Sequence, residues 1–186
     1  PVDRRQRQMC IRDSFKRAGG VPVNIPGGEL YTALQTGVID ATEWVGPYND
    51  LAFGFQQIAK YYYFPGWHEP GSMLEFIINL DAWNELPTHL QSIVKTAAKA
   101  VNQDLLDEYT AMNNQALREL IDVHNVQLKK LPDDVINEFR VISKSVLDEI
   151  AENDNQFKSI YESYLKFKSE VVSYHEISED AYTKIR

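Results

Sequence analysis

The spacing of apolar residues ahead of position 50 predicts a short helix followed by a short strand. Residues 29–35 carry apolar side chains at helical spacing. Gly37 comes next, where the end of a helix favours a residue of positive φ. Val38 and Ile39 are β-branched and apolar, which is typical of a buried strand. This strand is expected to deliver residues 40–44, several of them polar or acidic, to its carboxyl end.

Two further strands and a helix are predicted around these elements. Apolar and polar side chains alternate in residues 21–25, and residues 73–79 are almost uniformly apolar. Residues 50–59 have the spacing of a helix. The strand–helix–strand order that ends at residues 38–39 favours a parallel sheet. Because open parallel sheets bind ligands at the carboxyl ends of their strands, we expect a binding site near residues 40–44.

The second half of the chain is predicted to be mainly helical. Residues 88–121 repeat apolar side chains at helical spacing and contain no Gly or Pro, which predicts one helix of roughly 50 Å. A helix of this length is expected to brace two lobes or to follow an interface. A strand is predicted at 126–131, and a helix is predicted on each side of a polar break at 153–155.

Composition narrows the classes of protein that this chain can belong to. Its 186 residues, 44% of them hydrophobic, are enough for a sizeable core. A formal net charge of −8 argues against nucleic acid as a partner. Cys10 is the single cysteine, so the chain can form neither an intrachain disulfide nor a cysteine-based zinc cluster. No apolar run approaches the roughly 20 residues of a membrane-spanning helix.

Residues 1–14 differ in composition from the rest of the chain. They contain four arginines and show neither helical nor strand periodicity. We interpret them as a non-native segment that resembles the translation of a sequencing adapter; the alternative is a native basic arm. On the first interpretation, the native sequence begins near Phe15 and is a carboxyl-terminal fragment of a longer protein.

Glu43 and Trp44 form the most specific candidate site. A carboxylate at the end of a strand can ligate a hard cation, and a neighbouring backbone carbonyl can join it. The indole of Trp44 could form an apolar wall for a small ligand. The alternative is a surface acid beside a tryptophan that serves only in packing.

His68 and Glu69 lie in a loop rich in Pro and Gly. Such a loop is held rigid, as a binding site requires, but the same composition also suits a plain turn. Glu43 and Glu69 could be the acid and base of a glycosidase, although nothing in their spacing favours this pair over other acids. The remaining histidines are expected to face solvent: His89, His124 and His175.

The motifs ALQTGVIDATEW and YYYFPGWHEPG indicate a family. They resemble the solute-binding proteins of tripartite ATP-independent periplasmic (TRAP) transporters, and within them the branch that binds 2-oxo acids and small hydroxy acids with a metal ion. The resemblance is close over residues 15–125 and looser over residues 126–186. It implies an α/β fold that is part of a two-lobed periplasmic binding protein clamshell, with a long bracing helix at 88–121 and a helical carboxyl-terminal tail.

The resemblance also implies a function in transport rather than catalysis. The chain would be a subunit in the bacterial periplasm that binds a small carboxylate, either a 2-oxo acid such as pyruvate or a hydroxy acid, and delivers it to the transporter's membrane subunits. A sodium or calcium ion would bridge to this ligand between the lobes.

The family motifs place the site on three residues of this sequence. The E-W motif falls on Glu43 and Trp44, which implies a side-chain metal ligand, a backbone-carbonyl metal ligand and an indole beside the substrate. The H-E-P-G loop places a further metal or substrate contact on Glu69. The family's carboxylate-pairing arginine and a metal-binding glutamine lie just upstream of Phe15, where the adapter-like segment stands. Arg12 occupies a suggestive position, but the resemblance does not transfer the arginine's role to it.

Two other functions and one assembly follow from the same residues. The first is an acid-base hydrolase that uses Glu43 and Glu69, and the second is a helical interaction module formed by the long helix and the tail. Residues 157–174 are apolar over more than one helical stripe. Because some members of the resembled branch pair by exchanging a carboxyl-terminal helix, a homodimer through this tail is expected. The alternative is that the tail folds back on its own subunit.

Overall fold

The computed structural model describes residues 2–68 and 75–186. The chain divides into two compact units, which we describe separately. The sheet unit is Val23–Pro132, and the helical unit combines Pro1–Pro22 with Asp133–Arg186. None of the helices in the described ranges combines the length and the apolar composition that a membrane span requires.

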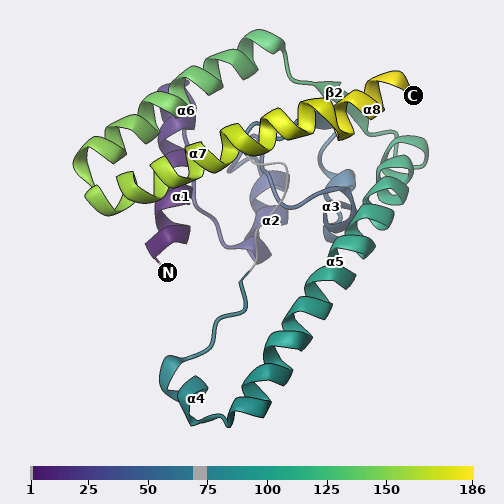
Figure 1. The fold of residues 1–186 in the computed structure, drawn as a ribbon. Helices are drawn as coiled ribbons and strands as arrows, with labels where there is room; N and C mark the ends of the chain where they lie inside the picture. The colour runs from purple at the N-terminus through teal and green to yellow at the C-terminus, as the bar shows by residue number, and fades with distance from the viewer. Residues whose placement is uncertain (1, 69–74) are drawn as a thin grey trace. The chain divides into compact units, whose positions relative to one another are not determined.

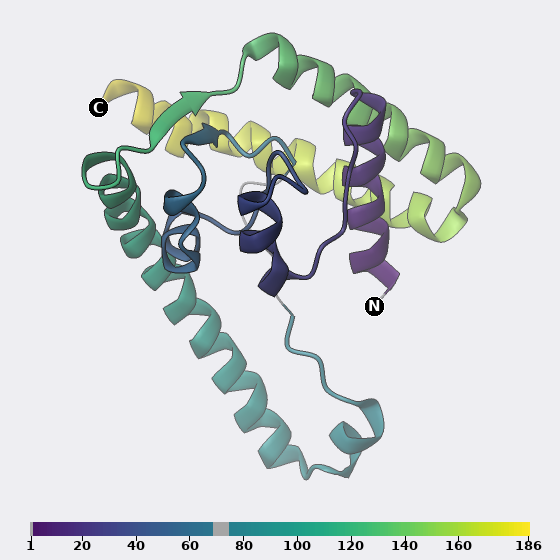
Figure 2. The same ribbon diagram turned by 180° about the vertical axis from the view of Figure 1, so that it is seen from behind.

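The sheet unit contains a two-stranded parallel sheet and one long helix (Figure 1). Strands β1 and β2 pair in the register Tyr61↔Gln127 to Phe64↔Lys130, and Figure 2 shows them side by side. In chain order, the elements of the sheet unit are η1 Gly27–Glu29, α2 Leu30–Gln35, α3 Pro47–Phe53, η2 Phe55–Gln57, β1 Tyr61–Phe64, α4 Leu80–Glu85, α5 Thr88–Asp122 and β2 Gln127–Lys130.

Helix α5 forms as predicted and supports the sheet unit near its carboxyl end. Ala116 and Leu120 are only 3% and 2% exposed, whereas Val101, nearer the amino end, is 65% exposed. Helix α3 packs on α5, and Tyr48 of α3 meets Tyr109 of α5 edge to face, with ring centroids 5.9 Å apart. The core of this unit therefore lies between α3 and the last turns of α5.

In its described residues, the helical unit contains four helices that pack in succession: α1 Val2–Arg17, α6 Asp133–Asn153, α7 Asn155–Ile177 and α8 Glu179–Ile185. Helix α1 packs on α6, α6 on α7, and α7 on α8. Phe15 stacks on Phe139 of α6 at 6.2 Å, and Ser14 and Val146 are buried. The predicted break at 153–155 is confirmed, because Asp154 caps α7 by accepting from the amides of Gln156 and Phe157.

The predicted strands at 21–25 and 38–39 are wrong. Neither segment is a strand, and Val38 is 69% exposed. The reason lies at the end of α2: the amides of Val38 and Ile39 both donate to the carbonyl of Ala33, at 2.9 and 3.3 Å. Gly37 does take the predicted positive φ, 72°. In this turn at the helix end, the amides of Val38 and Ile39 are already hydrogen-bonded and cannot pair with another strand.

Two other elements differ from their predictions. The helix expected over 50–59 is divided into α3 and η2, because Gly54 takes a left-handed φ of 84° and ends α3. In the strand expected over 73–79, residues 75–79 are irregular and residues 73–74 lie outside the described ranges. Residues 2–14, which lack helical periodicity, belong to helix α1.

Candidate functional site

The loop between α2 and α3 carries the two residues of the predicted site. Glu43 is well exposed, with 69% of its side chain accessible, and its Oε2 lies 3.5 Å from Nε2 of His68. The side chain of His68 is only 10% exposed, and its ring meets that of Trp67 edge to face at 5.3 Å. The structure therefore brings together Glu43 and His68, which the sequence placed in separate motifs. Glu69 lies outside the described residues.

Trp44 is part of an aromatic cluster. Its indole lies 5.1 Å from the ring of Phe53, which lies 5.1 Å from Phe55. Gly27 approaches the other part of the indole so closely that a Cβ atom there would stand 2.7 Å from Cη2. The indole is thus held in place by packing. A packing role and a place at a ligand site are compatible for this residue.

Helix α3 begins directly after the site loop and is held by an unusual set of polar contacts. Gly46 is its N-cap and offers no side-chain acceptor, and Pro47 occupies the first turn. The carboxylate of Asp50, 7% exposed, reaches back to the loop and accepts from the amide of Val45 at 3.4 Å. It also accepts from the hydroxyl of Tyr62 at 2.5 Å.

Burial is the main influence on the pKa of both Asp50 and Tyr62. Burial raises the pKa of the Asp50 carboxyl, and hydrogen bonds from Tyr62 and from the backbone of Val45 oppose the rise. The pKa of the Tyr62 hydroxyl is also raised, first by burial and then by its hydrogen bond to Asp50. Tyr62 therefore remains a hydrogen-bond donor throughout the physiological pH range.

A third contact comes from α5. Oδ1 of Asn113 accepts from the amide of Tyr48 at 3.0 Å, which satisfies one of the backbone donors left open at the start of α3. The sequence analysis missed Asp50, Tyr62 and Asn113. The G-P-x-x-D pattern of residues 46–50 was the available signal, because an acid in the first turn after Gly-Pro suits the amino end of a helix.

The described residues supply only part of a metal site. Within residues 2–68 and 75–186, no three His, Cys, Asp or Glu side chains converge on a point that could hold a metal ion. Glu43 offers an exposed carboxylate, and Trp44 offers a backbone carbonyl. These are the oxygen donors that a hard cation prefers, but such an ion takes about six or more of them. The residues present thus fit a sodium or calcium ion as two members of a larger shell.

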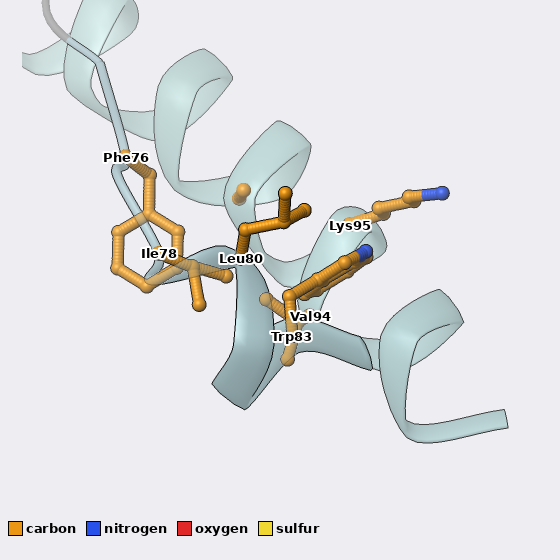
Figure 3. Close-up of a pocket in the computed structure, with 7 residues that line it drawn as sticks. Phe76, Ile78, Leu80, Trp83, Val94 and Lys95 are labelled. Carbon is orange, nitrogen blue, oxygen red and sulfur yellow. The ribbon is translucent and has the colours of Figure 1, made fainter. Parts of the chain in front are cut away.

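A separate hollow lies between residues 76–83 and α5 (Figure 3). Its volume is about 320 Å³, and the ammonium group of Lys95 lies 5.4 Å from the ring centroid of Trp83. Neither Glu43 nor Trp44 lines it. Among the described residues, its lining is Phe76, Ile78, Leu80, Trp83, Val94, Lys95 and Ala98.

Several known proteins are similar to this chain over most of its length. The chain is 40% identical over 164 residues to the monocarboxylate 2-oxoacid-binding periplasmic protein of Nostoc sp., an alignment that covers 88% of this chain and 45% of that protein. It is also similar to a solved TRAP periplasmic solute-binding protein from Colwellia psychrerythraea with bound calcium and pyruvate. That match has 38% identity and a TM-score of 0.90, and covers 94% of this chain and 53% of the other.

A second solved TRAP solute-binding protein, from Pseudoalteromonas atlantica, contains sodium and pyruvate. It is 36% identical, with a TM-score of 0.87, and the match covers 93% of this chain and 53% of that one. These likenesses confirm the fold class that the resemblance implied. The chain spans about half the length of the relatives that it matches.

The family model described as "bacterial extracellular solute-binding protein, family 7" matches residues 4–154. The match begins inside the adapter-like segment, whose origin stays a prediction. The family match extends over most of the chain, and a 40% identical relative aligns with 88% of the chain. Together these two matches establish the family of this chain. The chain belongs to family 7 of the bacterial extracellular solute-binding proteins, a class of transport proteins rather than of enzymes.

Proposed function

We propose that this chain is part of a periplasmic TRAP solute-binding protein that binds a 2-oxo acid such as pyruvate, or a small hydroxy acid, together with sodium or calcium. The observation that carries the proposal is the placement of Glu43. Its carboxylate is exposed on the loop between α2 and α3, in a chain that closely resembles proteins solved with pyruvate and either cation. The protein would deliver its ligand to the membrane subunits of the transporter.

The roles of the site residues follow from their chemistry. Glu43 would bind the cation through its carboxylate, and Trp44 would bind it through its backbone carbonyl while its indole lies beside the ligand. A bound cation supplies the positive charge that attracts the carboxylate of the ligand. Glu69 would add a metal or substrate contact, and it stays a prediction because it lies outside the described residues. No observation favours the acid-base hydrolase.

The proposal is tested by calorimetry with pyruvate on two proteins. The full-length protein that carries this chain should bind pyruvate in the presence of calcium or sodium, and lose binding when the cation is removed by a chelator or by exchange for choline. The 186-residue chain alone should bind weakly or not at all, because Glu43 and Trp44 supply too few of the oxygens that calcium needs. Pyruvate recovered unchanged would separate binding from turnover. Tight binding by the isolated chain would contradict the site assignment.

A further inference from the structure

The segment from Glu43 to Asp50, which covers the last part of the loop and the first turn of α3, is contacted at each end by the region of β1. At one end, the hydroxyl of Tyr62, in the middle of β1, donates to Asp50. At the other end, Nε2 of His68, a few residues after β1, lies 3.5 Å from the carboxylate of Glu43. The Glu43–Asp50 segment thus has a contact at each of its ends, and both contacts come from residues 62–68.

Asp50 is the centre of this arrangement. A carboxylate that is 7% exposed is rare in proteins unless it is paired or hydrogen-bonded, because its burial costs free energy. Its two oxygens have different partners: Oδ1 accepts from the amide of Val45 and Oδ2 accepts from Tyr62. One buried group therefore joins the backbone next to Trp44 to the sheet.

A capping role alone does not account for this residue. A helix needing only an N-cap usually has Ser, Thr, Asp or Asn at the cap position, where this chain has Gly46. The acid stands farther along, inside α3, and its bond to Val45 points back into the loop. The next open donor of the helix, the amide of Tyr48, is satisfied from α5 by Asn113. The first turn of α3 is thus anchored to both the sheet and the long helix.

We propose that Asp50 and Tyr62 are positioning residues that hold the backbone of residues 44–46, so that the Trp44 carbonyl and the Glu43 carboxylate are presented to a cation in one arrangement. This inference rests on the proposed function of Glu43 and Trp44 as cation ligands. Neither Asp50 nor Tyr62 touches the cation in this scheme. They reduce the loss of freedom that binding would otherwise require of the loop.

The first test measures the loop without any ligand, by amide hydrogen exchange of the 186-residue chain. Tyr62→Phe, which keeps the ring, and Asp50→Ala should each speed the exchange of the Val45 and Gly46 amides by roughly tenfold, the scale of one net hydrogen bond. The amide of Leu120, in the buried part of α5, should exchange at an unchanged rate. Asp50→Asn keeps an acceptor oxygen and should restore slow exchange.

The matched control is Tyr48→Phe. It also removes a tyrosine hydroxyl of the sheet unit, but that hydroxyl donates to the exposed Glu108 of α5 and does not contact the loop. Exchange at Val45 should be unchanged in this variant. The proposal is overturned if Tyr62→Phe and Asp50→Ala leave Val45 unaffected, or if they speed Val45 and Leu120 equally, since that would be general destabilisation.

The second test measures calcium affinity in the full-length protein that carries this chain. Tyr62→Phe and Asp50→Ala should weaken calcium binding at least about tenfold, with Asp50→Asn and Tyr48→Phe close to wild type. Unchanged calcium affinity in variants whose loop exchanges faster would overturn the proposal. If the wild-type protein binds neither calcium nor pyruvate, the proposed function fails, whereas the exchange data still decide whether Asp50 and Tyr62 order the loop.

Discussion

At the scale of single residues, the proposed site consists of one exposed acid and one indole that packs against other side chains. Glu43 is accessible, so its carboxylate is available to a ligand, whereas Trp44 is enclosed by Phe53 and by Gly27. Glu43 therefore faces solvent, whereas the position of Trp44 depends on the side chains around it. Changes to Glu43 should act first on binding, and changes around Trp44 should act first on folding.

Replacing Glu43 by Gln in the full-length protein should abolish cation-dependent pyruvate binding. The substitution keeps the shape of the side chain but removes the charge that offsets the cation. We expect calcium affinity to fall by at least about tenfold, or roughly 1.4 kcal/mol. Calorimetry measures the change, and Glu108→Gln serves as a control, because Glu108 is an exposed acid of the same unit that contacts Tyr48 instead. A smaller loss would mean that Glu43 is not a ligand.

Replacing Gly27 by Ala should destabilise the sheet unit. The new Cβ would stand 2.7 Å from Cη2 of Trp44, and the indole cannot move freely because Phe53 packs against it. Overpacking of this kind costs about 1–3 kcal/mol. Urea unfolding followed by tryptophan fluorescence measures the loss. Gly28→Ala is the control, since nothing lies within 4 Å of a Cβ at that position. Equal stabilities of the two variants would refute the contact.

At the scale of elements, helices were predictable from the sequence and most strands were not. The helix at 88–121 was found at Thr88–Asp122 because its apolar spacing is local. Val38 looked like a strand residue, yet a strand also needs a partner, and its amide is bonded to the end of α2 instead. The E-W motif could be recognised by its letters, and the G-P-x-x-D pattern could have marked Asp50 as an acid at the start of a helix. The bond from Tyr62 to Asp50 could not be predicted, because only the fold brings the two residues together.

The docking of α1 on α6 should depend on acidic pH. Arg17 donates to both oxygens of Glu149 at 2.6 Å, and this hydrogen bonding, with help from Ser145, lowers the pKa of the Glu149 carboxyl from 4.5 to about 2. A lowered pKa means that the contribution to stability is complete above pH 4.5 and is lost as pH falls from 4.5 towards 2. Amide exchange of Val146 should therefore quicken across that range, after correction for intrinsic exchange.

Arg17→Gln should remove most of this pH dependence by removing the charge that lowers the pKa of Glu149. The control is Lys144→Gln, because Lys144 pairs with Asp148 within α6 and does not join that helix to α1. The same pH profile in Arg17→Gln as in the wild type would show that the ion pair does not couple the two helices.

At the scale of the whole molecule, the chain corresponds to about half the length of its relatives, and it exposes much apolar surface. Helix α7 is the clearest case. Ile160 is 61% exposed and Phe167 is 63% exposed, while Phe157, Tyr161 and Val171 are partly buried. A helix with apolar side chains on a second face is suited to a second partner. We therefore retain the homodimer as a proposal.

Light scattering on the full-length protein should report a dimer that becomes a monomer when residues 152–186 are removed. A smaller change, Phe167→Ser, should weaken the dimer by removing a large exposed apolar side chain. Lys168→Ser, next to it on the same helix, should leave the dimer intact. A protein that is monomeric at high micromolar concentration with its tail present would exclude this mode of association.

The parallel sheet has a consequence for the order in which the chain folds. Tyr61 pairs with Gln127, so the pairing of β1 with β2 encloses all of α4 and α5 in a single loop. Closing so long a loop costs conformational entropy before any contact is gained, whereas α5 forms from neighbours in sequence. In stopped-flow refolding, helical circular dichroism should therefore develop before the fluorescence of Trp67, just beyond β1. Because Tyr62 reaches Asp50 only from β1, the loop that carries Glu43 and Trp44 should be among the last parts of the sheet unit to become ordered.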